Sequence, residues 1–319
     1  MVQTKALCPA ERCHEMKEIL RIIIGLTISC LVAAVVMGSV FAITDRAKKH
    51  NEHVKVQETM LGLLGYGKAN PPPSELRFAT IYRYILNENG NIRLGYMLPV
   101  FENGRETFEF MIVTPDGDFV EKLPLKIEPD AASEGPERET ALKSALKRST
   151  IFSFADSSIV ALKGKDRIAY LLPSEFPGFK TFVKVMLALD ARFSVIGLEI
   201  MEHEEDPGLG AEIAQPYFKN QFKGKAFDRL KELKVVKEPL PDEYKLALEG
   251  KALGKGAVSR EEVDALRQKY QGKDIFAITG ATISSRAVTD GVINAAKKFS
   301  YRLKALEKVI AAQQIAVAF

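Results

Sequence analysis

The stretch TIYRYILNENGNIRLGYML, from Thr80 to Leu98, says most about the fold of this chain. Residues 80–86 and 92–98 are rich in β-branched and aromatic side chains, which is typical of strands. Asn89-Gly90 between them is the strongest short-range signal for a two-residue hairpin turn, because both residues tolerate positive φ. We therefore expect an antiparallel pair of strands here.

Outward from this hairpin, the sequence predicts two more strand pairs. One pair is expected at 106–113 and 119–123, joined through Pro115-Asp116-Gly117-Asp118. The other is expected at 181–189 and 193–200, on either side of Asp190-Ala191-Arg192. The stretch between these pairs, 149–176, gives no clear strand or helix assignment.

Three helices are expected in the region after the hairpin. Residues 137–148 have the composition of a surface helix. Ser259 and Glu262 have capping-box spacing, so a helix should begin there. From about Ser285 to the end, apolar residues recur every three to four positions, which predicts a long helix with one apolar stripe. The predicted fold class is α+β, an antiparallel sheet packed with helices behind an amino-terminal membrane helix.

Residues 22–43 contain no charged side chain and are long enough to cross the hydrocarbon core of a bilayer as a helix. A cleaved signal peptide is the competing interpretation, because Val40-Phe41-Ala42 resembles a cleavage site. The apolar run exceeds the length of a signal core, which favours an uncleaved anchor. Basic residues flank the run on both sides, so charge does not choose its orientation.

Composition excludes several classes of protein. With 46% hydrophobic and 27% charged residues, the 319-residue chain can bury a sizeable core. The net charge of +4 is spread along the chain, which argues against a nucleic-acid partner. No cysteine follows Cys30, so the region after the anchor forms no internal disulfide. Cys8 and Cys13, followed by His14, have the wrong spacing for haem attachment and are interpreted as free thiols.

Two segments could carry chemistry. The first is HEEDPGLG at 203–210, whose glycines allow close approach of a ligand to the backbone, although local chemistry alone favours a tight turn between a strand and a helix. The second is TGATISSR at 279–286, where small and hydroxyl residues at a helix start suit a phosphate and Arg286 could add a charged fork. An ordinary helix cap is the alternative for this segment.

The second segment resembles the threonine-flavinylation motif S/T-G-A-T-x-S/T of FMN-binding domains. These domains occur in the G subunit of Rnf electron-transport complexes and the C subunit of Na+-translocating NADH:quinone reductase. The first segment resembles the H-x-E-T-P-G-L-G signature of the same family, with Asp206 standing where that family usually has Thr. Gln221-Phe222-x-Gly224 fits the continuation of that signature.

The resemblance implies that Thr282 carries FMN through a phosphoester bond made by a separate flavin transferase. It implies a cofactor site formed by both segments: Thr279, Gly280, Ala281, Thr282, Ser284, Ser285, Arg286, His203, Glu205, Pro207, Gly208, Leu209 and Gly210. A flavin supplies one- and two-electron chemistry that side chains lack. We find no paired nucleophile and base and no metal-ligand cluster. The resemblance implies an electron carrier that works inside a larger assembly.

The resulting plan divides the chain into five parts. They are a cytoplasmic tail at 1–21, a transmembrane helix at 22–43, a stalk with a Pro-rich linker at 44–74, the first part of an extracytoplasmic domain at 75–177, and an FMN-binding domain at 178–319. The expected partners are other membrane subunits of an Rnf-type ion-translocating complex, in the inner membrane, with the large domain on the periplasmic side. The quinone-reductase C subunit and a non-flavin extracytoplasmic binding module remain alternatives. A flavin-bearing sensor with further membrane helices and ferredoxin motifs lacks support, because neither addition is present.

Overall fold

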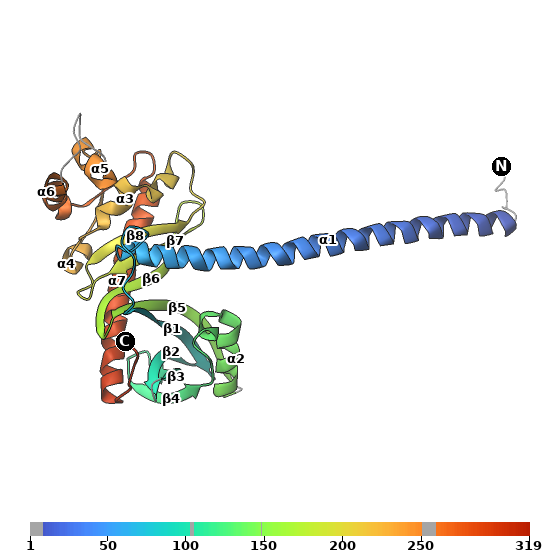
Figure 1. The fold of residues 1–319 in the computed structure, drawn as a ribbon, viewed down its shortest axis with the longest axis horizontal. Helices are drawn as coiled ribbons and strands as arrows, with labels where there is room; N and C mark the ends of the chain where they lie inside the picture. Colours follow the sequence, from blue (N-terminus) through green and yellow to red (C-terminus); the bar gives the residue numbers. More distant parts are fainter. Residues whose placement is uncertain (1–8, 103–104, 148, 251–259) are drawn as a thin grey trace. The chain divides into compact units, whose positions relative to one another are not determined.

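The computed structural model describes residues 9–102, 105–147, 149–250 and 260–319. The chain forms two compact units, Met1–Glu58 and Thr59–Phe319. Helix α1, Pro9–Leu63, runs through the first unit into the start of the second (Figure 1). It extends over most of the predicted tail, the predicted span and the predicted stalk as far as Leu63, while residues 1–8 of that tail lie outside the described residues.

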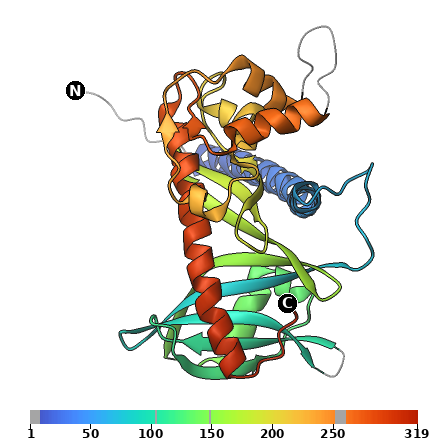
Figure 2. The ribbon, with the colours of Figure 1, turned by 90° about the vertical axis from the view of Figure 1, so that its left-hand side faces the viewer.

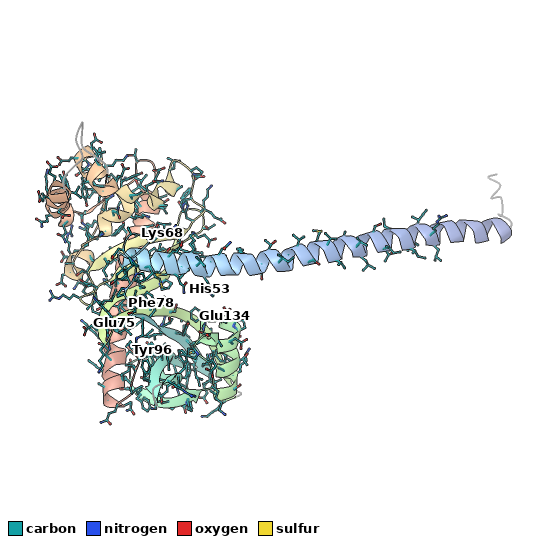
Figure 3. All side chains as sticks on the ribbon, in the orientation of Figure 1. His53, Lys68, Glu75, Phe78, Tyr96 and Glu134 are labelled. Carbon is teal, nitrogen blue, oxygen red and sulfur yellow. The ribbon has the colours of Figure 1, made fainter. Side chains whose placement is uncertain are left out.

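The predicted membrane helix lies within α1. Leu20–Asp45 spans 26 residues with a mean hydropathy of 2.4, and its large apolar side chains are exposed (Figure 3). Within the described ranges, this is the helix that has the length and composition to cross a membrane. Side chains this apolar are stable in contact with lipid, whereas water disfavours them.

The second unit is built on one eight-stranded antiparallel sheet with the order β4-β3-β2-β1-β5-β6-β7-β8 (Figure 1). The strands are β1 Leu76–Glu88, β2 Asn91–Glu102, β3 Arg105–Val113, β4 Phe119–Leu125, β5 Thr150–Lys163, β6 Asp166–Pro177, β7 Phe182–Leu189 and β8 Val195–Glu202. A short parallel pair joins β9, Val235–Val236, to β10, Ile275–Phe276. The α+β class predicted from the sequence is therefore confirmed.

The helices of this unit are of very different lengths. They are α2 Gly135–Ala145, α3 Pro216–Lys219, α4 Phe227–Leu230, α5 Asp242–Glu249, α6 Arg260–Gln271 and α7 Thr282–Ala312, with 3-10 turns at Ala131–Ser133, Gly210–Ala214 and Asn220–Phe222. Helix α7 runs alongside the sheet (Figure 2) and packs against β6 and β7. The predicted long helix is confirmed, although it ends at Ala312 and does not reach the end of the chain.

Two hydrophobic cores pack against the sheet, and residues of β1, β2 and β3 contribute to both. The larger core joins β6, β7 and β8 to α7 through fully buried residues such as Leu187, Val288 and Val292. The smaller core lies between β1 to β4 and α2, around Tyr84 and Phe110. Contact between α7 and β6 is so close that a Cβ on Gly291 would overlap the ring of Phe176.

All three predicted strand pairs are present. In the first, Glu88 pairs with Asn91, and Asn89 and Gly90 adopt φ values of 52° and 90°, as a two-residue hairpin of this type requires. The other two pairs are β3 with β4 and β7 with β8. The predicted surface helix corresponds to α2. Helix α6 begins at Arg260, while its predicted cap, Ser259, lies outside the described residues.

The sequence left β5 and β6 unassigned. Residues 159–162 of β5 and 169–172 of β6 are buried without interruption, since both faces of the sheet are covered there. Strands of this kind lose the alternation of polar and apolar residues that marks a half-buried strand. The turn at Gly178 separates β6 from β7, which are neighbours in the same sheet.

Candidate functional site

The first candidate segment, 203–210, follows β8 and leads into the 3-10 turn Gly210–Ala214. It folds back on itself, because the backbone N–H groups of Leu209 and Ala211 both donate to the carbonyl of Asp206, at 3.1 and 3.0 Å. Gly208 has a φ of 73°, a conformation that favours glycine. The segment is therefore a compact loop with a fixed shape.

The second candidate segment, 279–286, connects β10 to α7, whose first helical residue is Thr282. Gly280 turns the chain with a φ of 79°, and the N–H of Ala281 donates to the carbonyl of Ile278 at 3.0 Å. No side-chain hydrogen bond from the described residues caps this end of α7. The N–H groups of a first helical turn have no partner within the helix, so this terminus offers donors to an anion.

The two segments lie against each other although they are distant in the sequence. The hydroxyl of Ser284 donates to Oε2 of Glu205 at 2.5 Å. A Cβ placed on Gly280 would lie 2.9 Å from Cδ2 of Leu209, so this side chain covers the glycine. The fold thus brings both sequence-predicted segments to one site at the start of α7.

The predicted site residues divide into an inward and an outward group. The inward group is buried and consists of Glu205, Gly210, Ala281, Ser284 and Ser285. The outward group is exposed or partly exposed and consists of His203, Pro207, Gly208, Leu209, Thr279, Gly280, Thr282 and Arg286. Only the outward group can touch a ligand, while the inward group shapes the loops that carry it.

The inward hydroxyls are already used within the protein. Ser285 donates to the carbonyl of Ala281 at 2.9 Å and accepts from the N–H of Ile278 at 3.0 Å. Ser284 is bound to Glu205, as described above. Both serines therefore hold the first turn of α7 in place rather than facing solvent.

The outward group fits a ligand such as FMN, which has a phosphate at one end and a planar ring at the other. Thr282 and Arg286 lie one turn apart at the uncapped helix start, where a phosphate meets backbone donors and a guanidinium. Leu209 and Ile283 expose 46% and 61% of their surface, which gives a ring apolar contacts. A Cβ on Gly208 would meet nothing within 4 Å, so this glycine leaves open space beside the ring. The residues present thus match the chemistry of the cofactor.

Sequence reasoning missed the loop at 178–181. The backbone N–H groups of Phe179 and Lys180 donate to Oε1 of Glu205, at 2.7 and 3.3 Å. The ammonium of Lys180 lies 2.5 Å from a carboxylate oxygen of Asp206, which raises the pKa of Lys180. A Pro-Gly pair at the end of a strand was the available signal, but it indicates a turn without naming its partner.

Two further side chains border the site. Gln221 is buried and holds Phe276 on both sides, accepting from its N–H at 2.8 Å and donating to its carbonyl at 3.2 Å. This pair of bonds fixes the strand that leads into the second segment. Nδ1 of His203 is buried and has no hydrogen-bond partner among the described residues.

Comparison with known proteins agrees with this geometry. Residues 178–297 match the family model of the FMN-binding domain. The chain is 33% identical over 138 residues to the G subunit of the proton-translocating ferredoxin:NAD(+) oxidoreductase complex of Clostridium ljungdahlii, covering 43% of this chain and 57% of that protein. It is 29% identical over 129 residues to the G subunit of the ion-translocating oxidoreductase complex of Methanosarcina acetivorans, covering 40% of this chain and 50% of that protein. The chain thus spans about half the length of these curated relatives.

Among solved structures, NqrC of Shewanella oneidensis is similar at 19% identity and a TM-score of 0.34, over 50% of this chain and 65% of that one. The family match contains both candidate segments and the whole amino-terminal half of α7. The resemblance seen in the motifs is confirmed by the family model and by the two G-subunit relatives. Residues 178–297 of this chain are therefore similar to the FMN-binding domain family.

Proposed function

We propose that this protein is a membrane-anchored electron carrier that holds one FMN covalently on Thr282 and serves as a subunit of an Rnf-type ion-translocating complex. The observation that carries the proposal is the position of Thr282, which is the first residue of an uncapped helix inside a domain of the FMN-binding family. The G-subunit relatives support the type of assembly, and the apolar helix Leu20–Asp45 supports the anchor.

The hydroxyl of Thr282 can carry FMN through a phosphoester bond. The Oγ1–P bond of a phosphoester forms as a P–O bond to a leaving group breaks, so the donor must be an activated, anhydride-linked form of FMN. A flavin transferase would supply the base that accepts the hydroxyl proton. Backbone N–H groups and Arg286 would then neutralise the bound phosphate. The bound flavin supplies one- and two-electron transfer.

Fluorescence of the denatured chain tests the attachment. After co-production with a flavin transferase, the wild-type band in a denaturing gel should fluoresce under ultraviolet light, and Thr282→Ala should abolish the signal. Thr140→Ala on α2 is the matched control, since it removes an exposed helical threonine far from the site. Fluorescence that survives in Thr282→Ala would place the flavin elsewhere, and a dark wild-type band would favour a non-flavin binding module.

The side of the membrane can be tested with cysteine chemistry, because the chain has no cysteine after Cys30. Asp116→Cys places one thiol on an exposed turn of the large unit. We propose that this unit is extracytoplasmic, so a membrane-impermeant maleimide should label Asp116→Cys in intact cells. Labelling only after cell lysis would show that the large unit lies on the cytoplasmic side.

A further inference from the structure

Glu205 is a buried carboxylate at the centre of the site. It is 5% exposed, and three donors reach it: the backbone N–H groups of Phe179 and Lys180 on Oε1, and the hydroxyl of Ser284 on Oε2. All three partners donate, which suits an acceptor-only carboxylate. Burial of such a group is costly unless it is hydrogen-bonded, so these contacts determine whether the loop is stable.

Glycines make room for this carboxylate. A Cβ on Gly210 would lie 2.5 Å from Oε2 of Glu205 and 2.9 Å from the Ser284 hydroxyl, and a Cβ on Gly178 would overlap Oε1. Gly178 also donates its N–H to the carbonyl of Thr181 at 2.7 Å, which closes the loop around the acid. The chain therefore encloses the Glu205 side chain from two separate segments.

The contact with Ser284 sets the orientation of the first turn of α7. Ser284 and Thr282 are two residues apart in a helix, so they point to different sides. Fixing Ser284 on the inside leaves Thr282 on the outside. A carboxylate near a helix amino terminus is also favourable for the helix dipole.

We propose that Glu205 is a positioning residue which, through Ser284, presents the Thr282 hydroxyl for attachment of FMN. This inference rests on the function proposed above. It gives the two sequence signatures one physical link, because the glutamate of the first signature binds a serine hydroxyl of the second. Glu205 itself faces the protein interior, so it acts through the helix start and does not touch the flavin.

The full-length chain tests this role in two independent measurements. The first is the rate at which a flavin transferase adds FMN, followed by intact mass. The second is amide hydrogen exchange in the peptide 279–288 of chain produced without the transferase, which needs no flavin. Glu205→Ala and Ser284→Ala should slow attachment and speed exchange by about tenfold, as loss of buried hydrogen bonds implies.

Two controls separate positioning from stability. Glu205→Gln keeps an acceptor for the N–H groups and a polar contact to Ser284, so it should restore both measurements at least halfway towards wild type. Leu142→Ala opens a cavity in the core beneath α2, so it should lower the melting temperature yet leave attachment and local exchange unchanged.

The outcomes distinguish the two proposals. If wild type gains FMN and both Glu205→Ala and Ser284→Ala gain it equally fast, with unchanged exchange, the positioning role is wrong while the proposed function stands. If attachment falls in Leu142→Ala as much as in Glu205→Ala at equal loss of stability, the positioning role is also wrong. A wild-type chain that gains no FMN contradicts the proposed function, and exchange still reports whether Glu205 orders the helix start.

Discussion

Lys225 places its ammonium group in the protein interior, where it donates to the carbonyls of Gln271 and Lys273 at 2.8 and 2.7 Å. The residue is 1% exposed. Burial, helped by the nearby Arg229, lowers the pKa of Lys225 to about 8, while Asp274 opposes this effect. The contacts fix the chain just before β10, the strand that leads into the second candidate segment.

This buried amine predicts a dependence of stability on pH. The unfolded chain keeps the Lys225 proton up to a pKa of 10.5, whereas the folded chain releases it above about 8. The folded state binds fewer protons in that window, so the free energy of unfolding should rise with pH there. Relative to Lys225→Met, the free energy of unfolding of wild type should rise by up to about 1.4 kcal/mol per pH unit. Urea unfolding at several pH values between 7 and 10 would measure this rise. If the free energy of unfolding changes with pH in the same way in both proteins, the predicted effect of Lys225 is wrong.

Gly291 lets α7 approach β6 without a side chain between them. A Cβ at this position would overlap the ring of Phe176, which is 4% exposed and cannot move into solvent. Gly291→Ala should therefore lower the free energy of unfolding by about 1–3 kcal/mol. Gly62→Ala is the control, because its Cβ would meet nothing within 4 Å on helix α1. Equal stability of Gly291→Ala and wild type in chemical denaturation would contradict the close packing.

The residue types of the candidate site could be predicted from the sequence, but their directions could not. Glu205, Ser284 and Thr282 all belong to recognisable motifs, yet the first two face inward and the third faces partly outward. Direction depends on which distant segment supplies a partner, here the backbone of Phe179 and Lys180. A local pattern contains no information about such a partner.

At the scale of elements, the turn between β1 and β2 depends on one glycine. Gly90 has a φ of 90°, and a Cβ there would meet nothing within 4 Å, so the strain of a substitution would come from the backbone alone. Gly90→Ala should cost about 1 kcal/mol of stability. Gly67→Ala, also in open space but without a positive φ, should cost much less. Similar thermal unfolding of the two variants would contradict this account of the turn.

Elements with a strong local signal could be predicted, and those defined by their surroundings could not. The β1–β2 hairpin has its own turn sequence, and α7 has an apolar stripe that matches the core it covers. Strands β5 and β6 have neither, because they lie in the middle of the sheet with both faces covered. Their sequences lack the alternation of polar and apolar residues that identifies a strand, so they can be assigned only once the neighbouring strands are known.

At the scale of the whole molecule, the chain combines an apolar helix with a unit that has its own cores. Residues 59–319 form one compact unit, and Met60 and Leu63 at its start pack within it. A chain lacking residues 1–58 should therefore be soluble and cooperatively folded, while the full chain should stay with membranes in alkaline carbonate and need detergent. Fractionation followed by thermal unfolding checks both. Aggregation of the shortened chain, or release of the full chain by carbonate, would contradict this division.

The proposed function depends on the covalent bond between Thr282 and FMN. Trypsin should release the peptide 274–286 from protein isolated from its native cells, because Lys273 and Arg286 border it. The mass of this peptide should be raised by one FMN joined through phosphate, and fragmentation should place the group on Thr282. An unmodified peptide from fully assembled native protein, or a flavin on another residue, would show that Thr282 is not the attachment residue.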